Sequence, residues 1–190
     1  KVRKLLRKLD DSSSYLLKGL INKKENNFEE ALSSFEKSDN SESLYEIGRL
    51  LFKGKGNIPE DKSKGVEFFE KSIQKGCVKC MHKYGLILFK GEGIPENKEK
   101  GITYLKEAVE HKYAPALYQY SEMIEKGEIT GEDTNNNYLK ESAYQGYPDA
   151  LLTYSNKLRY IPNTQDQYLR FYKKGADKGN LDCLFFYGDV

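Results

Sequence analysis

The sequence has 190 residues, of which 38% are hydrophobic and 32% are charged. Fifteen tyrosines and nine phenylalanines supply the large side chains that a polar chain needs to build a core. The 31 basic and 29 acidic residues are interspersed and leave a net charge of +2, which argues against nucleic acid as a partner, because that binding needs a concentrated positive field. No apolar run is long enough to predict a membrane span.

The first nine residues place apolar side chains on one helical face and basic side chains on the other. Val2, Leu5, Leu6 and Leu9 form the apolar face. We interpret this segment as a helix that packs on the first repeat, with its charges solvated. The alternative is a basic amphipathic helix that meets an anionic membrane or an acidic helix.

A helical hairpin is expected between Tyr15 and Ser38, with its break at Asn26-Asn27. Its aromatic and small residues follow spacings that resemble the tetratricopeptide repeat, in which such residues interlock the two helices. The residues at these spacings are Tyr15, Gly19, Ala31 and Phe35. Together with the N-terminal helix, this hairpin defines a first region at residues 1–42.

A second pattern starts at residue 43 and recurs at steps of 33 to 37 residues. Each unit carries an aromatic or aliphatic residue followed by a small one: Ile47-Gly48, Tyr84-Gly85, Tyr120-Ser121, Tyr154-Ser155 and Tyr187-Gly188. A period of this length indicates stacked supersecondary units. Small residues at one repeated position indicate close approach of two helices.

The turn inside each of the first two units is rich in glycine and is followed by proline. Gly54 and Gly56, like Gly91 and Gly93, are expected to end the first helix in a left-handed conformation. Asp61 or Asn97 then stands where it would cap the second helix.

This arrangement resembles the Sel-one-like repeat, a relative of the tetratricopeptide repeat with a longer inner turn. The resemblance covers residues 43–190, in units at 43–79, 80–115, 116–149 and 150–182 and a truncated unit at 183–190. The turns at residues 128–137 and 160–164 diverge from the pattern. Repetition and resemblance together predict an all-α, right-handed α-solenoid superhelix of antiparallel helix-turn-helix repeats, continuous from end to end.

Cysteine and histidine patterns give no sign of metal or cofactor chemistry. Cys77 and Cys80 form a CxxC motif that no second Cys or His pair accompanies, and Cys80 and Cys183 occupy a small-residue packing position. We therefore predict no metal, no cofactor and no catalytic residue. Reduced thiols favour a cytoplasmic location.

The candidate binding surface is a stripe along the first helices, at the third, seventh and tenth positions of each repeat. First helices line the concave side of such solenoids, so the stripe could form a groove for a peptide or a helix. The alternative is ordinary packing between repeats. The candidate residues are Tyr45, Arg49, Phe52, His82, Phe89, Tyr118, Glu122 and Arg159.

The resemblance implies a protein-interaction scaffold or adaptor rather than an enzyme. Because the chain starts at Lys1 without Met and ends at Val190 within a helix, we expect it to be part of a larger multidomain protein. Two alternatives stay open. One is a small-ligand or enzymatic cleft that uses His82 and Glu122, and the other is self-association through the end from Leu184 to Val190.

Overall fold

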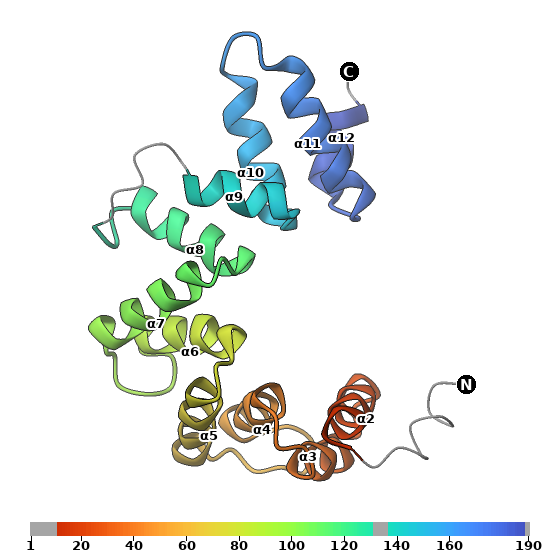
Figure 1. Ribbon diagram of the computed structural model, residues 1–190, viewed down its shortest axis with the longest axis vertical. Coiled ribbons are helices and arrows are strands. Elements are labelled where there is room, and N and C mark those ends of the chain that lie inside the picture. Colours follow the sequence, from red (N-terminus) through yellow and green to blue (C-terminus); the bar gives the residue numbers. More distant parts are fainter. Residues whose placement is uncertain (1–10, 131–136, 189–190) are drawn as a thin grey trace. The chain divides into compact units, whose positions relative to one another are not determined.

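The computed structural model describes residues 11–130 and 137–188, and these residues form helices joined by short turns (Figure 1). The helices are α2 (Ser12–Lys24), α3 (Phe28–Glu36), α4 (Ser41–Lys53), α5 (Lys62–Gln74), α6 (Val78–Lys90), α7 (Lys98–Glu110), α8 (Ala114–Glu125), α9 (Asn137–Gln145), α10 (Pro148–Arg159), α11 (Gln165–Asp177) and α12 (Leu181–Gly188). Within these residues the only extended pairing is an isolated bridge between Lys55 and Ile58. The basic segment at residues 1–9 and most of the divergent turn at 128–137 lie outside the described residues.

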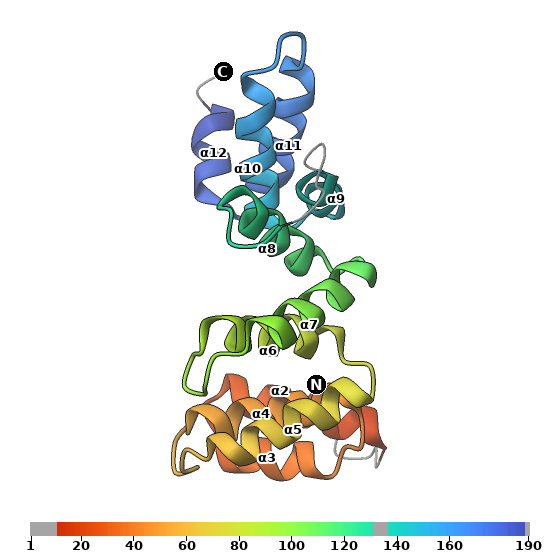
Figure 2. The same ribbon diagram turned by 90° about the vertical axis from the view of Figure 1, so that its left-hand side faces the viewer.

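The chain divides into two compact units, residues 1–104 and 105–190, with the division inside α7. In the first unit α2 packs on α3, α3 on α4, and α4 on both α5 and α6. In the second unit α8 packs on α9, α9 on α10, and α10 on α11 and α12. Successive helices run antiparallel in each unit, as the two views show (Figures 1 and 2). The prediction of an all-α chain of helix-pair repeats is confirmed.

Polar side chains fix the starts of the helices where the sequence predicts them. The carboxylate of Asp61 accepts a hydrogen bond from the Lys64 amide at 2.9 Å, and Asn97 accepts one from the Lys100 amide at 3.0 Å. Asn40 caps α4 in the same way, through the Ser43 amide at 2.8 Å. Each cap satisfies an amide that has no partner inside its own helix.

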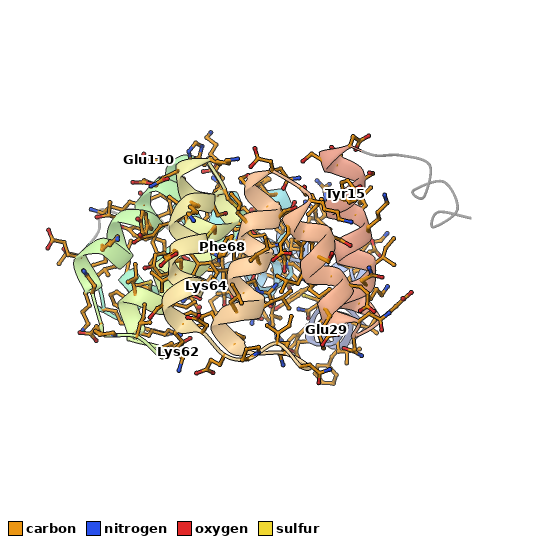
Figure 3. The ribbon with its side chains drawn as sticks, turned by 90° about the horizontal axis from the view of Figure 1, so that it is seen from below. Tyr15, Glu29, Lys62, Lys64, Phe68 and Glu110 are labelled. Atoms are coloured by element: carbon orange, nitrogen blue, oxygen red, sulfur yellow. The ribbon has the colours of Figure 1, made fainter. Side chains whose placement is uncertain are left out.

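Glycines end the first helix of a repeat and also allow two helices to touch. Gly91 terminates α6 in the left-handed conformation at φ 65° and ψ 32°. Gly48 on α4 faces α5, where a β-carbon would lie 2.7 Å from the Phe69 ring and 3.0 Å from the Gly65 carbonyl oxygen. The outer surface of α5 carries Lys64 and Phe68 (Figure 3).

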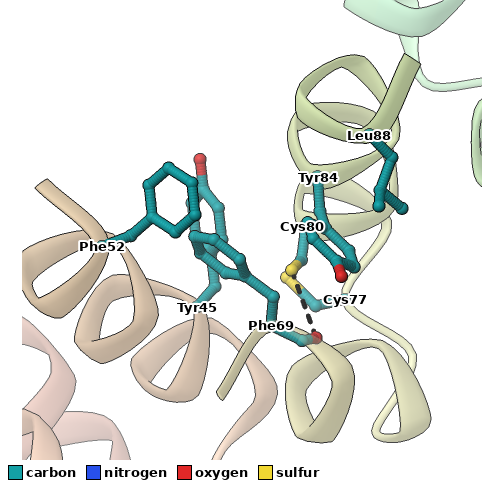
Figure 4. Packing of buried hydrophobic residues seen from close by; sticks show 7 residues of the cluster. All are labelled: Tyr45, Phe52, Phe69, Cys77, Cys80, Tyr84 and Leu88. Carbon is teal, nitrogen blue, oxygen red and sulfur yellow. Dashed lines mark hydrogen bonds between the residues drawn. The ribbon is translucent and has the colours of Figure 1, made fainter. Parts of the chain in front are cut away.

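The buried side chains form clusters that follow the repeats. Ala31, Phe35, Ile47, Leu50 and Ile58 join the first hairpin to α4. A second cluster joins α4, α5 and α6 through Tyr45, Phe52, Phe69, Cys77, Cys80, Tyr84 and Leu88 (Figure 4). In the second unit, a cluster that includes Leu139, Leu151, Leu158 and Phe171 joins α9, α10 and α11.

Candidate protein-binding groove

A groove with a volume of about 410 Å³ opens in the first unit, where α4, α5 and α6 meet; we call it the α4–α6 groove. Helix α4 supplies one side and helix α6 the other, and Phe69 of α5 lies at the bottom. The lining residues are Tyr45, Arg49, Phe52, Lys53, Phe69, Lys79, Lys83, Leu86, Ile87, Lys90 and Glu92.

The floor of the groove is aromatic and firmly packed. The ring centroids of Tyr45 and Phe69 lie 6.0 Å apart, and those of Phe52 and Phe69 lie 5.6 Å apart. Tyr45 and Phe69 are only 2% and 1% exposed, and burial holds the pKa of the Tyr45 phenol well above its usual value. The same rings belong to the α4–α5–α6 cluster (Figure 4), so the core itself forms the floor.

A buried carboxylate lies next to this floor. Glu46 is 1% exposed, and its carboxylate lies 2.6 Å from the Lys23 ammonium and 3.2 Å from the Arg49 guanidinium. The Lys79 ammonium approaches it at 3.7 Å. A buried carboxylate needs such partners, because an unpaired charge out of water is costly. Glu46 therefore ties together α2, α4 and α6.

The rim of the groove is cationic. Arg49 and Lys79 flank the Tyr45 ring, at 5.6 and 5.4 Å from its centroid. Burial lowers the pKa of the Lys83 ammonium. The pKa of Lys83 is lowered further by the positive charges of neighbouring side chains, which are Arg49, Lys53, Lys79 and Lys90. Like charges thus converge on the mouth of the groove.

Three of the predicted binding residues line the groove: Tyr45, Arg49 and Phe52. His82 and Phe89 lie on α6 but are 3% and 8% exposed, and neither lines it. Burial, and then the charge of Lys83, lowers the pKa of His82 to about 4, so the side chain is neutral at pH 7. The Phe52 ring lies 5.6 Å from that of Phe69 on α5, and the Phe89 main chain lies against Gly101 of α7, so neighbours in the same helix pair contribute to the burial of both residues.

The other three predicted residues belong to the second unit. The Tyr118 ring lies 5.5 Å from that of Tyr147, and its hydroxyl is 3.5 Å from the Thr153 hydroxyl. Glu122 pairs with Lys126 at 3.7 Å. The Arg159 guanidinium lies 5.8 Å from the centre of the Phe186 ring. Each of these side chains contacts neighbours within its own unit.

Sequence reasoning missed the lysines of the rim. On α6, Lys79, Lys83, Leu86 and Lys90 follow one another at spacings of four, three and four residues, which places them on one helical face. On α4, Lys53 follows Arg49 by four residues. The position of these lysines on one helical face was the signal in the sequence that could have revealed the rim.

Neither metal chemistry nor a membrane span finds support in the described part of the chain. Among those residues no group of three or more His, Cys, Asp and Glu side chains could hold a metal ion. No helix there is long and apolar enough to cross a membrane. The Cys80 thiol donates to the Phe69 carbonyl oxygen at 3.4 Å, and burial raises its pKa to about 12 (Figure 4).

These features define a helix-pair repeat protein with an open groove on its first helices. The sequence profile of the Sel1 repeat matches residues 41–77 and 78–113. The chain therefore carries two Sel1 repeats, and α4 and α6, which line the groove, are the first helices of those repeats. The resemblance to Sel-one-like repeats is confirmed for residues 41–113.

Solved structures share the fold at low sequence identity. A Sel1 repeat protein from Oxalobacter formigenes is 22% identical, with a TM-score of 0.72 over 94% of this chain and 75% of that one. A protective antigen of uropathogenic Escherichia coli that displays an SLR fold is 16% identical (TM-score 0.54, 93% of this chain and 48% of that one). An immunity protein from Pseudomonas aeruginosa is 17% identical (TM-score 0.59, 77% and 55%). The chain thus spans about half the length of the last two.

Proposed function

We propose that this protein is an interaction scaffold that docks a segment of a partner protein in the α4–α6 groove. Sel1 repeats in general serve as protein-interaction scaffolds and are typically not enzymes. The observation that carries the proposal is the groove itself, an open hollow on the first helices with a packed aromatic floor. A preformed floor favours binding, because its buried rings do not have to be ordered when the partner arrives.

The surface that a partner would contact combines aliphatic side chains with a cationic side chain. Leu86 and Ile87 are half-buried on α6 and present aliphatic surface beside the buried rings. Arg49 adds a forked cation that lies against Tyr45. Residues of these kinds are frequent anchors at protein interfaces.

Site-specific photo-crosslinking in cells tests this proposal. A photoreactive amino acid at Leu86 should capture a partner, whereas the same residue at the exposed Lys64 of α5 should not (Figure 3). Mass spectrometry would identify the captured protein, and Leu86→Ser should weaken its binding to the purified chain. Equal capture from both positions would refute docking in the groove.

A second candidate function is self-association through α12. Leu181, Leu184 and Phe185 are 77%, 54% and 63% exposed, which is unusual for large apolar residues on one short helix. Sedimentation velocity of the chain and of a Leu184→Ser, Phe185→Ser variant measures it. A concentration-dependent dimer that the variant loses supports self-association, and a monomer at every concentration excludes it.

A further inference from the structure

The rim of the α4–α6 groove concentrates positive charge far beyond the balance of the whole chain. Five of its lining residues are cations and only Glu92 is an anion, whereas the chain as a whole has 31 basic and 29 acidic residues. The cations are Arg49, Lys53, Lys79, Lys83 and Lys90. Such a local field attracts and orients anionic groups.

Three of these cations already have carboxylate partners in the folded chain. Arg49 pairs with Glu46 at 3.2 Å, and Lys90 pairs with Glu92 at 3.6 Å. Lys79 lies 3.2 Å from Glu42 and 3.7 Å from Glu46. Intramolecular pairing therefore accounts for part of the rim.

Lys53 and Lys83 differ from these three cations in their lack of a nearby carboxylate in the described part of the chain. Both are exposed at the rim, and no carboxylate of residues 11–130 or 137–188 lies within ion-pair distance of either ammonium group. They stand on facing helices, Lys53 at the end of α4 and Lys83 in the middle of α6. The groove thus offers two uncompensated charges above an aromatic and aliphatic floor.

We infer that the segment docked in this groove is an acidic peptide, with carboxylate side chains facing Lys53 and Lys83 and an aromatic or aliphatic side chain between them on the floor. This inference rests on the proposed docking function and adds the chemical class of the partner. Lysine ammonium groups suit single carboxylate oxygens, since they act as compact point charges. A volume of about 410 Å³ accommodates a few side chains of a peptide.

The corresponding repeat positions of the second unit are less cationic, and Lys126, at the position of Lys53, is paired with a carboxylate. There Glu122 and Glu125 occupy the positions that Arg49 and Phe52 hold in the first Sel1 repeat. Lys126 and Lys157 pair with these two glutamates, at 3.7 and 3.0 Å. The cationic groove is therefore local to the Sel1 repeats, and it lacks the long basic track that a nucleic acid backbone requires.

Peptide display on the purified full chain tests the inference even while the partner is unidentified. A random peptide library should yield binders in which Asp or Glu flanks an aromatic or aliphatic residue. Affinity of a selected peptide is then measured by fluorescence anisotropy. The variant Lys53→Gln, Lys83→Gln should lose about two- to thirty-fold in affinity, as expected for two exposed ion pairs.

A variant with the same change in net charge provides the control. Lys64→Gln with Lys71→Gln removes two exposed lysines of α5 that do not line the groove, and it should bind with unchanged affinity. Thermal melts of both variants should coincide with that of the parent, which separates lost binding from lost folding.

The outcomes distinguish the inference from the function on which it rests. Neutral or basic peptides that lose binding in Leu86→Ser would keep the docking function and overturn the acidic partner. Peptides that bind independently of the groove would overturn both. If an oligothymidine competed with the selected peptide at equal concentration, the groove would bind polyanions in general, and the inference of an acidic peptide would be overturned.

Discussion

Substituting Gly101 by alanine tests whether backbone contact between α6 and α7 sets the packing of the second Sel1 repeat. A β-carbon at Gly101 would lie 2.8 Å from the Gly85 carbonyl oxygen and 2.8 Å from the Phe89 amide nitrogen. It would also lie 3.1 Å from the Phe89 α-carbon. All three atoms belong to the main chain of α6, so no side-chain rotation can relieve the clash.

The cost follows from this geometry. The helices would have to separate by about 0.6 Å to restore an ordinary contact of 3.4 Å. Overpacking costs about 1–3 kcal/mol, and rigid main-chain neighbours place this site near the upper end. Alanine regains about 1 kcal/mol of helix propensity. We therefore expect a net loss of about 2 kcal/mol in the free energy of unfolding, or about 4–8 °C in Tm.

Urea unfolding followed by far-ultraviolet circular dichroism measures this change. Gly188→Ala is the matched control, because a β-carbon at Gly188 meets no atom within 4 Å. Its free energy of unfolding should stay within about 0.5 kcal/mol of the parent. If Gly101→Ala were as stable as the parent or more so, close main-chain contact would not be what requires glycine there.

Three further predictions concern buried polar groups. Glu46→Gln should lower the free energy of unfolding by about 1.5–3 kcal/mol in urea titrations, because Lys23 and Arg49 lose a buried charged acceptor, while Glu42→Gln at an exposed pair should cost at most about 1 kcal/mol. Folding lowers the pKa of His82 from 6.5 to about 4, so between these pH values the unfolded state binds more protons than the folded state. Lowering the pH from 6.5 towards 4 should therefore reduce the free energy of unfolding by about 1.4 kcal/mol per pH unit. A His82→Gln variant should lack this slope. Burial raises the pKa of Cys80 to about 12 and that of Cys183 to about 11, so both thiols should react with a disulfide reagent far faster in urea than in buffer; fast reaction in buffer would contradict their burial.

The fold was predictable because its determinants are local and repeat. Glycine pairs in the inner turns, and caps at Asp61 and Asn97, follow from rules that act within one or two helical turns. Repetition at nearly constant spacing then fixes which helices pair. The first hairpin was equally predictable, since Gly19 leaves room for the Phe35 ring, which a β-carbon at that position would overlap.

The candidate site was less predictable, because it depends on how far each helix is rotated about its axis. Tyr45 and His82 occupy the same repeat position, yet Tyr45 forms the groove floor and His82 turns away from it. A helical wheel cannot separate these two outcomes. The lysine rim was difficult to predict for another reason. Lysines on one exposed helical face are common, and they form a cationic rim only where a facing helix brings further cations close.

The Glu46 network has a consequence for how the first unit unfolds. In most repeat arrays each unit contacts only its neighbours, so the array can melt one unit at a time from an end. Glu46, on the repeat between them, binds Lys23 from the first hairpin and also lies beside Lys79 from the second Sel1 repeat, so one side chain contributes to two successive interfaces. Fraying of either segment would remove one partner of a carboxylate that is 1% exposed, and this raises the cooperativity of residues 12–90 as one block. Amide hydrogen exchange in α2 should then report the opening of α6 as well as that of its own hairpin.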